Sequence, residues 1–268
     1  MVWSKVKNIV ILILVLLNLC LLLLIVGQHL QSMRYEEETL RQTLEALSLN
    51  GITVEENALP DEMELPALNV TKDEEKERKT AKLLLGDGVI STNSGGMSIY
   101  SSPTGNLSFY GGGAVMGELA LDWRNLTNSA SPTGVLLKGL EIELWSLTPG
   151  ENEMEVIPLI NGAPVFNGAL TFRYDGDILV GIEGRMPGLC TPDQEQKPAI
   201  TIPTALISLL EYVAESGTVC RSVRGMVPGY YVTASGTDSA RLSPCWRVQT
   251  DTVTFYISAL DGKVTRAD

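Results

Sequence analysis

The sequence predicts an α+β protein with a single N-terminal transmembrane helix, followed by an extracytoplasmic domain of antiparallel β-sheets with packed helices. Three observations lead to this prediction. Residues Ile9–Val26 are apolar except for Asn18, residues 87–186 contain several alternating segments, and residues 201–268 give a helix followed by short strands. Alternation with period two is typical of half-buried strands, and a helix followed by a meander is typical of α+β domains.

The apolar run is long enough to cross a bilayer, because at about 1.5 Å per residue it spans roughly 27–30 Å, the thickness of a hydrocarbon core. Lys5 and Lys7 precede the run, which favours a cytoplasmic N-terminus and places the rest of the chain outside. A cleaved signal peptide is the alternative, but signal segments are shorter and no Ala-x-Ala-like site follows Gly27. We therefore expect a cytoplasmic tail over residues 1–7 and a retained anchor over residues 8–28.

A helical stalk and a linker are expected over residues 29–86. Leucines at near-helical spacing predict a helix over Ser32–Leu49, which Asn50-Gly51 would end. Its apolar stripe could pack against its own domain or against a neighbouring helix, and both alternatives stay open. A short strand is expected at Gly51–Val54.

The next stretch contains Pro60 and Pro66, which disfavour helix and interior strand, so an extended linker is expected through Val70. Thr71 followed three residues later by Glu74 forms a capping box. This motif predicts a helix over Lys72–Leu85, which Gly86 would close.

A first α+β unit is expected over residues 87–200. Asp175-Gly176-Asp177 gives the clearest hairpin turn in this unit. Gly111–Gly113 lacks the Gly-Lys-Ser/Thr ending of a phosphate loop and is interpreted as a turn. A helix or loop is expected at Pro132–Leu140, and the loop Pro187–Pro198 is a candidate joint. Strands are predicted at Ser98–Ser101, Asn106–Tyr110, Met154–Leu159, Ala169–Tyr174 and Ile178–Arg185.

A second α+β unit is expected over residues 201–268, with a helix over Pro203–Ser216 and an Asp261-Gly262 turn. Trp246 and Tyr256 lie on adjacent predicted strands, where they would pair across the sheet and belong to the core. The alternative is that an exposed Trp246 serves as a binding anchor. Strands are predicted at Val219–Met226, Tyr230–Ala234, Cys245–Thr250, Thr254–Ala259 and Val264–Arg266.

Composition disfavours several function classes. The net charge of −12 is poorly suited to nucleic acid or anionic lipid headgroups. The single histidine, His29, abuts the expected anchor, which argues against a histidine-dependent triad, and no spacing fits a zinc site. Paired carboxylates would suffice for glycoside hydrolysis, but the predicted strands show no acidic cluster beyond ordinary solvated positions. We therefore predict no enzyme activity, no catalytic residues, no metal and no cofactor.

The cysteines leave the redox question open. Cys20 lies within the expected anchor, and Cys190, Cys220 and Cys245 lie outside it. An odd number allows three free thiols or one disulfide with one free thiol.

Several segments occur in a distinctive order: Trp3–Asn8 before the anchor, Leu49–Val54 followed by Leu59-Pro60 and Leu65–Leu68, Asn161–Phe166, and Leu242–Val248 with Phe255–Val264. In order and spacing they resemble the YycI-type regulators of two-component systems, in the wider YycH/YycI family. The last pair also resembles PepSY-like modules, which carry a Pro-x-Trp-Arg strand, an aromatic strand and a Gly-containing turn. Cys245 and Gly111–Gly113 depart from the family pattern.

The resemblance implies a membrane-anchored regulator of a sensor histidine kinase of the WalK/YycG kind, working beside a YycH-like sister protein in cell-wall homeostasis. It brings no catalytic residues. Association is expected to involve membrane helices, where Asn18 would hydrogen-bond across helices or to its own backbone. Asn18, Trp246 and Tyr256 are the candidate interaction residues. The rival hypothesis is a membrane-tethered binding module for a wall or peptide ligand, which would show a concave polar site in place of a broad apolar patch.

Overall fold

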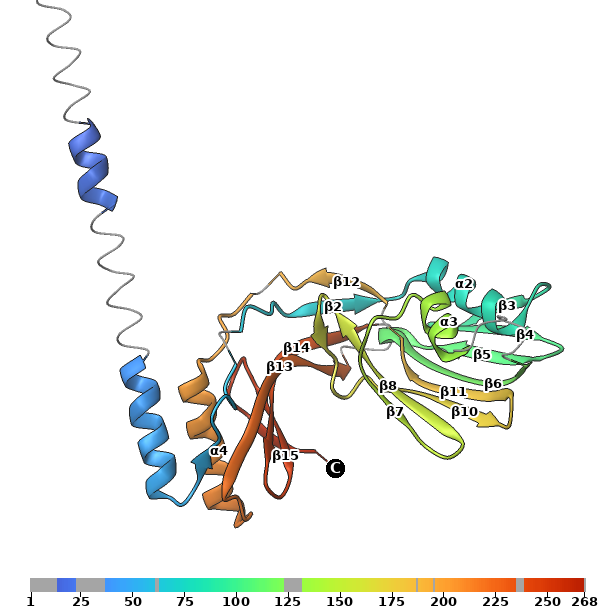
Figure 1. Ribbon diagram of the computed structural model, residues 1–268. Coiled ribbons are helices and arrows are strands. Elements are labelled where there is room, and N and C mark those ends of the chain that lie inside the picture. The colour runs from blue at the N-terminus through green and yellow to red at the C-terminus, as the bar shows by residue number, and fades with distance from the viewer. Residues whose placement is uncertain are drawn as a thin grey trace, which may run out of the picture. The chain divides into compact units, whose positions relative to one another are not determined.

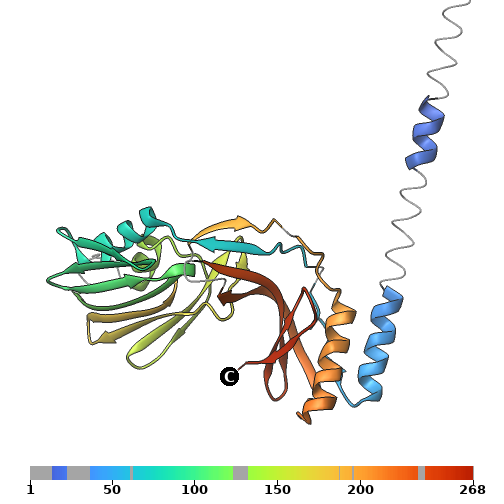
Figure 2. The same ribbon diagram turned by 180° about the vertical axis from the view of Figure 1, so that it is seen from behind.

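The computed structural model describes residues 14–22, 37–60, 63–122, 132–186, 188–194, 196–234 and 239–267. The chain divides into two compact units, Met1–Thr53 and Val54–Asp268. The second unit holds two antiparallel sheets with few helices, shown from opposite sides in Figures 1 and 2. The predicted α+β class with antiparallel sheets is therefore confirmed.

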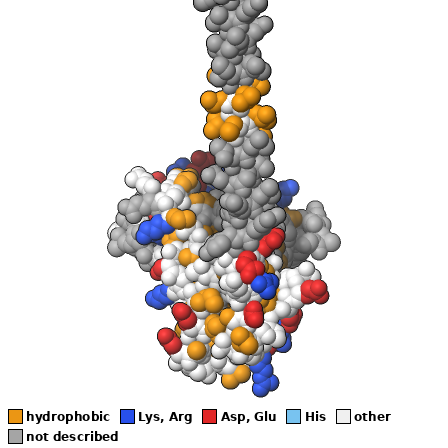
Figure 3. Space-filling view, turned by 90° about the vertical axis from the view of Figure 1, so that its left-hand side faces the viewer, with side chains coloured by type: hydrophobic (Ala, Val, Ile, Leu, Met, Phe, Trp, Pro, Cys, Tyr) orange, Lys and Arg blue, Asp and Glu red, His pale blue; other side chains and the backbone are white. Residues whose placement is uncertain are grey.

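The described parts of the first unit are helical at residues 14–22 and 37–49. Residues 14–22 expose apolar side chains, visible as the orange band between grey stretches in Figure 3. Within the described ranges, no helix combines the length and the apolar character that a membrane crossing requires. Residues 8–13 and 23–28 of the expected anchor lie outside the described residues, so the anchor stays a prediction.

The helix over residues 37–49 ends as Asn50-Gly51 predicts. Gly51 has a left-handed φ of 79°, and its N–H donates to the Ser48 carbonyl at 3.0 Å. The Ile52 N–H donates to the Leu47 carbonyl at 2.9 Å, which completes a Schellman motif. Leu47 and Ile52, the apolar pair typical of this motif, are both buried. Residues 32–36 of the expected helix lie outside the described residues.

The larger sheet has nine strands in the order β3-β4-β5-β6-β11-β10-β8-β7, with β9 paired to β8. The strong turn signal at Asp175-Gly176 is confirmed, since it joins β10 to β11 in an antiparallel hairpin. The strands are β3 (Ile90–Ser94), β4 (Met97–Ser102), β5 (Gly105–Phe109), β6 (Ala114–Asp122), β7 (Leu144–Pro149), β8 (Glu153–Ile160), β9 (Ala163–Pro164), β10 (Leu170–Asp175) and β11 (Ile178–Arg185).

One face of the nine-stranded sheet is apolar and packs under two helices, α2 (Glu74–Leu85) and α3 (Pro132–Gly139). Strand alternation explains this, because β6 and β8 bury every second residue. The core under the helices includes Leu84, Leu136, Leu107, Val156 and Phe172. Charged residues such as Glu118 and Glu155 lie on the other face, which is exposed.

The smaller sheet has seven strands, in the order β1-β13-β14-β15-β16, with β2 pairing both β12 and β14. Helix α4 (Ile202–Ser216) confirms the helix predicted over Pro203–Ser216, with Pro203 in its first turn and Gly217 as its C-cap. Its Tyr212 contacts Phe255 of β15 at 5.7 Å between ring centroids. The strands are β1 (Thr53–Val54), β2 (Leu68–Thr71), β12 (Leu189–Pro192), β13 (Ser222–Ala234), β14 (Ala240–Thr250), β15 (Thr254–Ser258) and β16 (Val264–Arg266).

Two predicted irregular stretches contain strands. The expected linker ends in β2 and the expected loop Pro187–Pro198 contains β12, and the two pair in register from Leu189↔Thr71 to Pro192↔Leu68. Pro60 and Pro66 both precede β2, so they do not interrupt its ladder. β2 comes from the expected linker and β12 from the expected first unit. Both thus belong to the same sheet as the strands of the expected second unit.

Two further local predictions were wrong. Asp73, not Thr71, caps α2, because its Oδ1 accepts from the Lys76 N–H at 3.0 Å while Thr71 ends β2. The predicted strands Val219–Met226 and Tyr230–Ala234 form one strand, β13, which passes through Pro228-Gly229. Its long pairing with β14 outweighs the local turn signal.

Candidate functional site

The two sheets are connected by the short segment Val165–Asn167, which follows β9. Val165 forms a parallel bridge with Tyr230, and the Phe166 N–H donates to the Tyr230 carbonyl at 3.0 Å. The Asn167 side chain donates to the Val232 carbonyl at 2.9 Å and accepts from the Val232 N–H at 2.6 Å. The Asn161–Phe166 motif of the sequence therefore leads directly into the joint of the sheets.

An aromatic cluster lies at this joint. It consists of Trp145 on β7, Phe166, Tyr231 on β13, Arg247 on β14 and Tyr256 on β15. Phe166 is central: its ring stacks on Tyr256 at 5.6 Å and meets Trp145 edge-on at 5.7 Å. Tyr231 lies 5.5 Å from Tyr256, again between centroids. Side chains from both sheets thus form one contiguous aromatic surface.

Arg247 places a positive charge in this cluster. Its guanidinium carbon lies 5.4 Å from the Trp145 ring centroid and 6.0 Å from that of Phe166, which is cation–π range. Burial raises the pKa of the Tyr256 phenol, and the neighbouring Arg247 guanidinium partly opposes this rise. The phenol is therefore a neutral hydrogen-bonding group at physiological pH.

The close packing of Phe166 depends on Gly229. A Cβ at this position would lie 2.6 Å from the Phe166 ring and 2.6 Å from the Pro164 carbonyl oxygen. Gly225, on the same face of β13, would meet nothing within 4 Å. The face that carries Arg247 and Tyr256 is thus covered by Phe166 at Gly229 and open at Gly225.

The cluster continues into an exposed apolar strand. Leu144, Trp145 and Leu147 of β7 are 39%, 36% and 38% exposed. In the described part of the chain, β7 is the last strand of the nine-stranded sheet and pairs only with β8. Exposed apolar side chains that lie together mark interaction surfaces more often than isolated ones do.

The predicted candidates Trp246 and Tyr256 lie on opposite faces of the sheet. Trp246 pairs with Ile257, whereas Tyr256 pairs with Arg247, so the expected Trp246–Tyr256 pair does not form. The two strands were predicted correctly, but their register was wrong by one residue. A shift of one residue moves each side chain to the other face of the sheet. Trp246 is 1% exposed and belongs to the core, while Tyr256 belongs to the aromatic cluster.

Asn18, the third candidate, lies on the exposed helix of residues 14–22, away from any contact that the structure describes. Trp145, Phe166 and Arg247 were missed. A signal for Arg247 existed, because period two on β14 separates it from the buried Trp246. Nothing local connects Trp145 or Phe166 to β14, because they are far away in the sequence.

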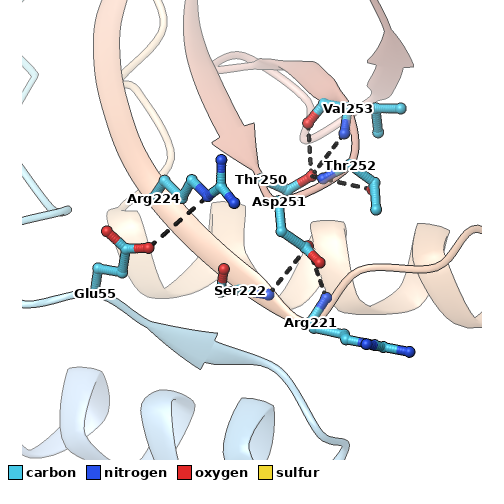
Figure 4. A network of polar contacts seen from close by, with 8 residues as sticks. All are labelled: Glu55, Arg221, Ser222, Arg224, Thr250, Asp251, Thr252 and Val253. Atoms are coloured by element: carbon cyan, nitrogen blue, oxygen red, sulfur yellow. Dashed lines mark hydrogen bonds and ion pairs between the residues drawn. The ribbon is translucent and has the colours of Figure 1, made fainter.

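A separate polar network secures the turn between β14 and β15 (Figure 4). The Asp251 carboxylate accepts from the N–H groups of Arg221 and Ser222 at 2.9 and 3.2 Å, and these bonds lower the pKa of Asp251. Thr250 Oγ1 donates to the Val253 carbonyl at 2.6 Å, and Arg224 pairs with Glu55 at 3.9 Å. These contacts hold the turn against the start of β13. The polar groups at the turn therefore have a structural role, and no binding or catalytic role is needed to explain them.

The cysteines outside the expected anchor are free thiols. Cys220 and Cys245 are buried and Cys190 is half-buried, and burial raises the pKa of all three, that of Cys245 to about 12. Thiols of this kind are predominantly protonated at neutral pH. Among the described residues, no group of three or more His, Cys, Asp or Glu side chains is arranged to hold a metal ion.

Ten chains among the solved structures are similar to this chain. No family model matches the chain, and no curated protein matches it. The chain is similar to the crystal structure of an uncharacterized protein from Eubacterium rectale ATCC 33656, with a TM-score of 0.47 and 12% identity over 82% of this chain and 92% of that chain. It is also similar to the Bacillus megaterium YpeB C-terminal domain, with a TM-score of 0.36 and 12% identity over 74% and 99% of the two chains. Likeness at this level assigns no function.

Proposed function

We propose that this protein is a membrane-anchored extracytoplasmic regulator of a two-component sensor histidine kinase of the WalK/YycG kind. It is a YycI-type protein with a PepSY-like C-terminal part, inserted once in the cell membrane with its N-terminus in the cytoplasm. It works by protein–protein association beside a YycH-like sister protein and contributes to cell-wall homeostasis.

The observation that supports this proposal most is the apolar surface formed by β7 and the aromatic cluster. Trp, Tyr and Arg are the residue types that contribute most to binding at protein interfaces, and Trp145, Tyr256 and Arg247 lie together here. The order of β14, which carries Pro244-Cys245-Trp246-Arg247, then the aromatic strand β15 and the Asp261-Gly262 turn also follows the order that the PepSY-like resemblance implies.

Site-specific photo-crosslinking in native membranes tests the proposal. A photoreactive amino acid replaces Trp145 in one variant and Ile90 in a matched control, since Ile90 is an exposed residue on β3, at the other end of the same sheet. We expect mass spectrometry to find the sensor kinase or the YycH-like protein joined to position 145 and absent from position 90. If neither protein is trapped by either variant, the proposal fails and the ligand-binding module becomes the better reading.

The membrane part of the proposal has its own test. Protease added to intact protoplasts should digest the portion after Arg34, and protection of that portion would refute the topology. Asn18→Leu removes the polar group whose interhelical hydrogen bond would be worth about 0.6–2 kcal/mol. We expect this variant to co-purify less kinase or sister protein while the extracytoplasmic fold survives. Unchanged recovery would confine the association to the extracytoplasmic domain.

A further inference from the structure

Arg247 differs from the other described arginines of β13 and β14. Arg224 pairs with Glu55 at 3.9 Å, and Arg241 pairs with Asp193 at 2.8 Å. No carboxylate of the described residues lies within ion-pair distance of Arg247, whose neighbours are the rings of Trp145 and Phe166. In a chain with a net charge of −12, a half-buried arginine without a carboxylate partner lies between the buried Phe166 and the exposed Trp145.

The chemistry of a ring-bound arginine favours an anionic ligand. A guanidinium that lies over aromatic rings keeps its N–H donors in its own plane, where they match the two oxygens of a carboxylate. Arginine is also more weakly hydrated than lysine, so its desolvation on binding costs less. The Tyr256 hydroxyl already accepts a hydrogen bond from Arg247, and its own proton can donate one more to a ligand.

The apolar part of the surface has the shape of a strand. Leu144, Trp145 and Leu147 lie on β7, whose register shifts at Trp145 and which pairs with β8 alone among the described strands. Extended segments bind beside such strands, with main-chain hydrogen bonds for affinity and alternate side chains for specificity. A segment of this kind would bring its side chains past both the apolar residues and Arg247.

We propose that this surface binds an extended acidic segment of a partner protein, with a carboxylate on Arg247 and apolar side chains against Trp145 and Leu147. The identity of the partner rests on the proposed function, whereas the chemistry of the segment rests on the charges and exposures given above. The acidic segment is attracted by Arg247 alone and not by the protein as a whole, because the net charge of the chain is negative.

The test uses the full chain in nanodiscs of uncharged phosphatidylcholine and measures fluorescence anisotropy. The probe is a fluorescein-labelled octapeptide of alternating Leu and Glu with blocked ends, which favours an extended conformation. Its twin carries Lys in place of Glu. We expect the Glu peptide to bind, the Lys peptide to bind far less, and high salt to weaken binding of the Glu peptide. Absence of binding by the Glu peptide, or equal binding of the two peptides, would overturn the inference.

Variants locate the site. Arg247→Ala is expected to weaken binding of the Glu peptide about tenfold or more, because it removes the charged partner of the peptide carboxylate. Arg173→Ala is the matched control, since Arg173 is also a strand arginine but lies opposite Glu153 on the nine-stranded sheet. Arg247→Glu should reverse the preference in favour of the Lys peptide, which mere unfolding could not do. Equal losses in the Arg173 and Arg247 variants would contradict the assignment.

Failure of the inference and failure of the proposed function give different results. If kinase trapping at position 145 persists in the Arg247→Ala protein, the kinase role stands and the acidic-segment site is wrong. If the Glu peptide binds through Arg247 but no kinase is trapped, the site stands and the kinase role is wrong.

Discussion

Both sheets are antiparallel and have helices packed on one face. They differ on the opposite face, which these helices leave uncovered. On the nine-stranded sheet, Arg173 lies opposite Glu153, and Thr171 lies between Glu155 and Glu183, so charged and polar groups alternate in an ordinary solvated surface. On the seven-stranded sheet, Arg247 lies opposite Tyr256, and Phe166 covers Gly229. The same residue type, an arginine in mid-strand, has a carboxylate neighbour in one sheet and aromatic neighbours in the other.

This difference between the two faces is a better guide to a candidate binding surface than the two cores are. Both cores are buried apolar layers beneath helices, which any stable α+β domain needs. A solvated mixed-charge face needs no explanation beyond solubility, whereas the exposed apolar side chains of β7 next to the aromatic cluster do. The following predictions test whether the face with the aromatic cluster is a binding surface or only a second core.

The largest expected effect comes from the core side of β14. Trp246→Ala removes a side chain that is 1% exposed and should lower the free energy of unfolding by about 3–5 kcal/mol. Trp145→Ala, at a partly exposed position, should cost clearly less. Urea unfolding of the two variants checks this comparison. Equal losses would mean that the aromatic cluster is a core and that its exposure carries no functional meaning.

A smaller effect is expected from the contact between Phe166 and β13. Gly229→Ala would place a methyl group 2.6 Å from both the Phe166 ring and the Pro164 carbonyl, and should cost about 1–3 kcal/mol by overpacking. Gly225→Ala on the same face meets open space and should stay within about 0.5 kcal/mol of the parent. Thermal unfolding compares the pair. If both variants lose equal stability, strand propensity and not the Phe166 contact is responsible.

The hydrogen bonds at the joint should contribute less again. Asn167→Ala removes both bonds between the Asn167 side chain and the Val232 main chain, and should cost about 1 kcal/mol. Hydrogen exchange at the Val232 amide should rise more than at amides in the middle of β6. Unchanged protection at Val232 would show that the bridge from Val165 to Tyr230 holds the joint without Asn167.

The smallest effect concerns a buried carboxyl group on α2, one of the helices that pack on the nine-stranded sheet. Glu77 on α2 is buried, and burial raises its pKa, opposed by Ser98 and by Lys72 at 4.0 Å. A raised folded-state pKa means that the folded protein binds this proton more tightly than the unfolded chain does. Stability from this group is therefore greatest below the ordinary glutamate pKa of about 4.3 and declines as the pH rises toward the raised value.

Glu77→Gln should remove that decline. We expect the variant to match the parent in acid and to exceed it in stability near neutral pH, as measured by urea unfolding across this range. A variant that is less stable than the parent at neutral pH would show that the Lys72 ion pair outweighs the cost of burial.

Local sequence signals predicted helix ends and hairpin turns well, but they predicted poorly which segments pair with one another in the sheets. Gly51 and Gly217 end their helices because a left-handed residue is needed there, and Asp175-Gly176 forms its hairpin because turn chemistry is local. The signals failed where distant pairing decided the outcome. Pro228-Gly229 resembles a turn but lies inside β13, and the stretch ending at Val70 resembles a linker but pairs with β12 and β14.

The sequence by itself determined the α+β class and the position of α4 and of the central hairpin, because periodicity and caps depend on neighbouring residues in the chain. Only the tertiary structure decided the register of β14 on β15, and with it which of Trp246 and Arg247 is buried. It alone brought Trp145 and Phe166 to Arg247. The physical reason is that register and the joint between sheets depend on contacts between segments far apart in the chain, which no local pattern encodes.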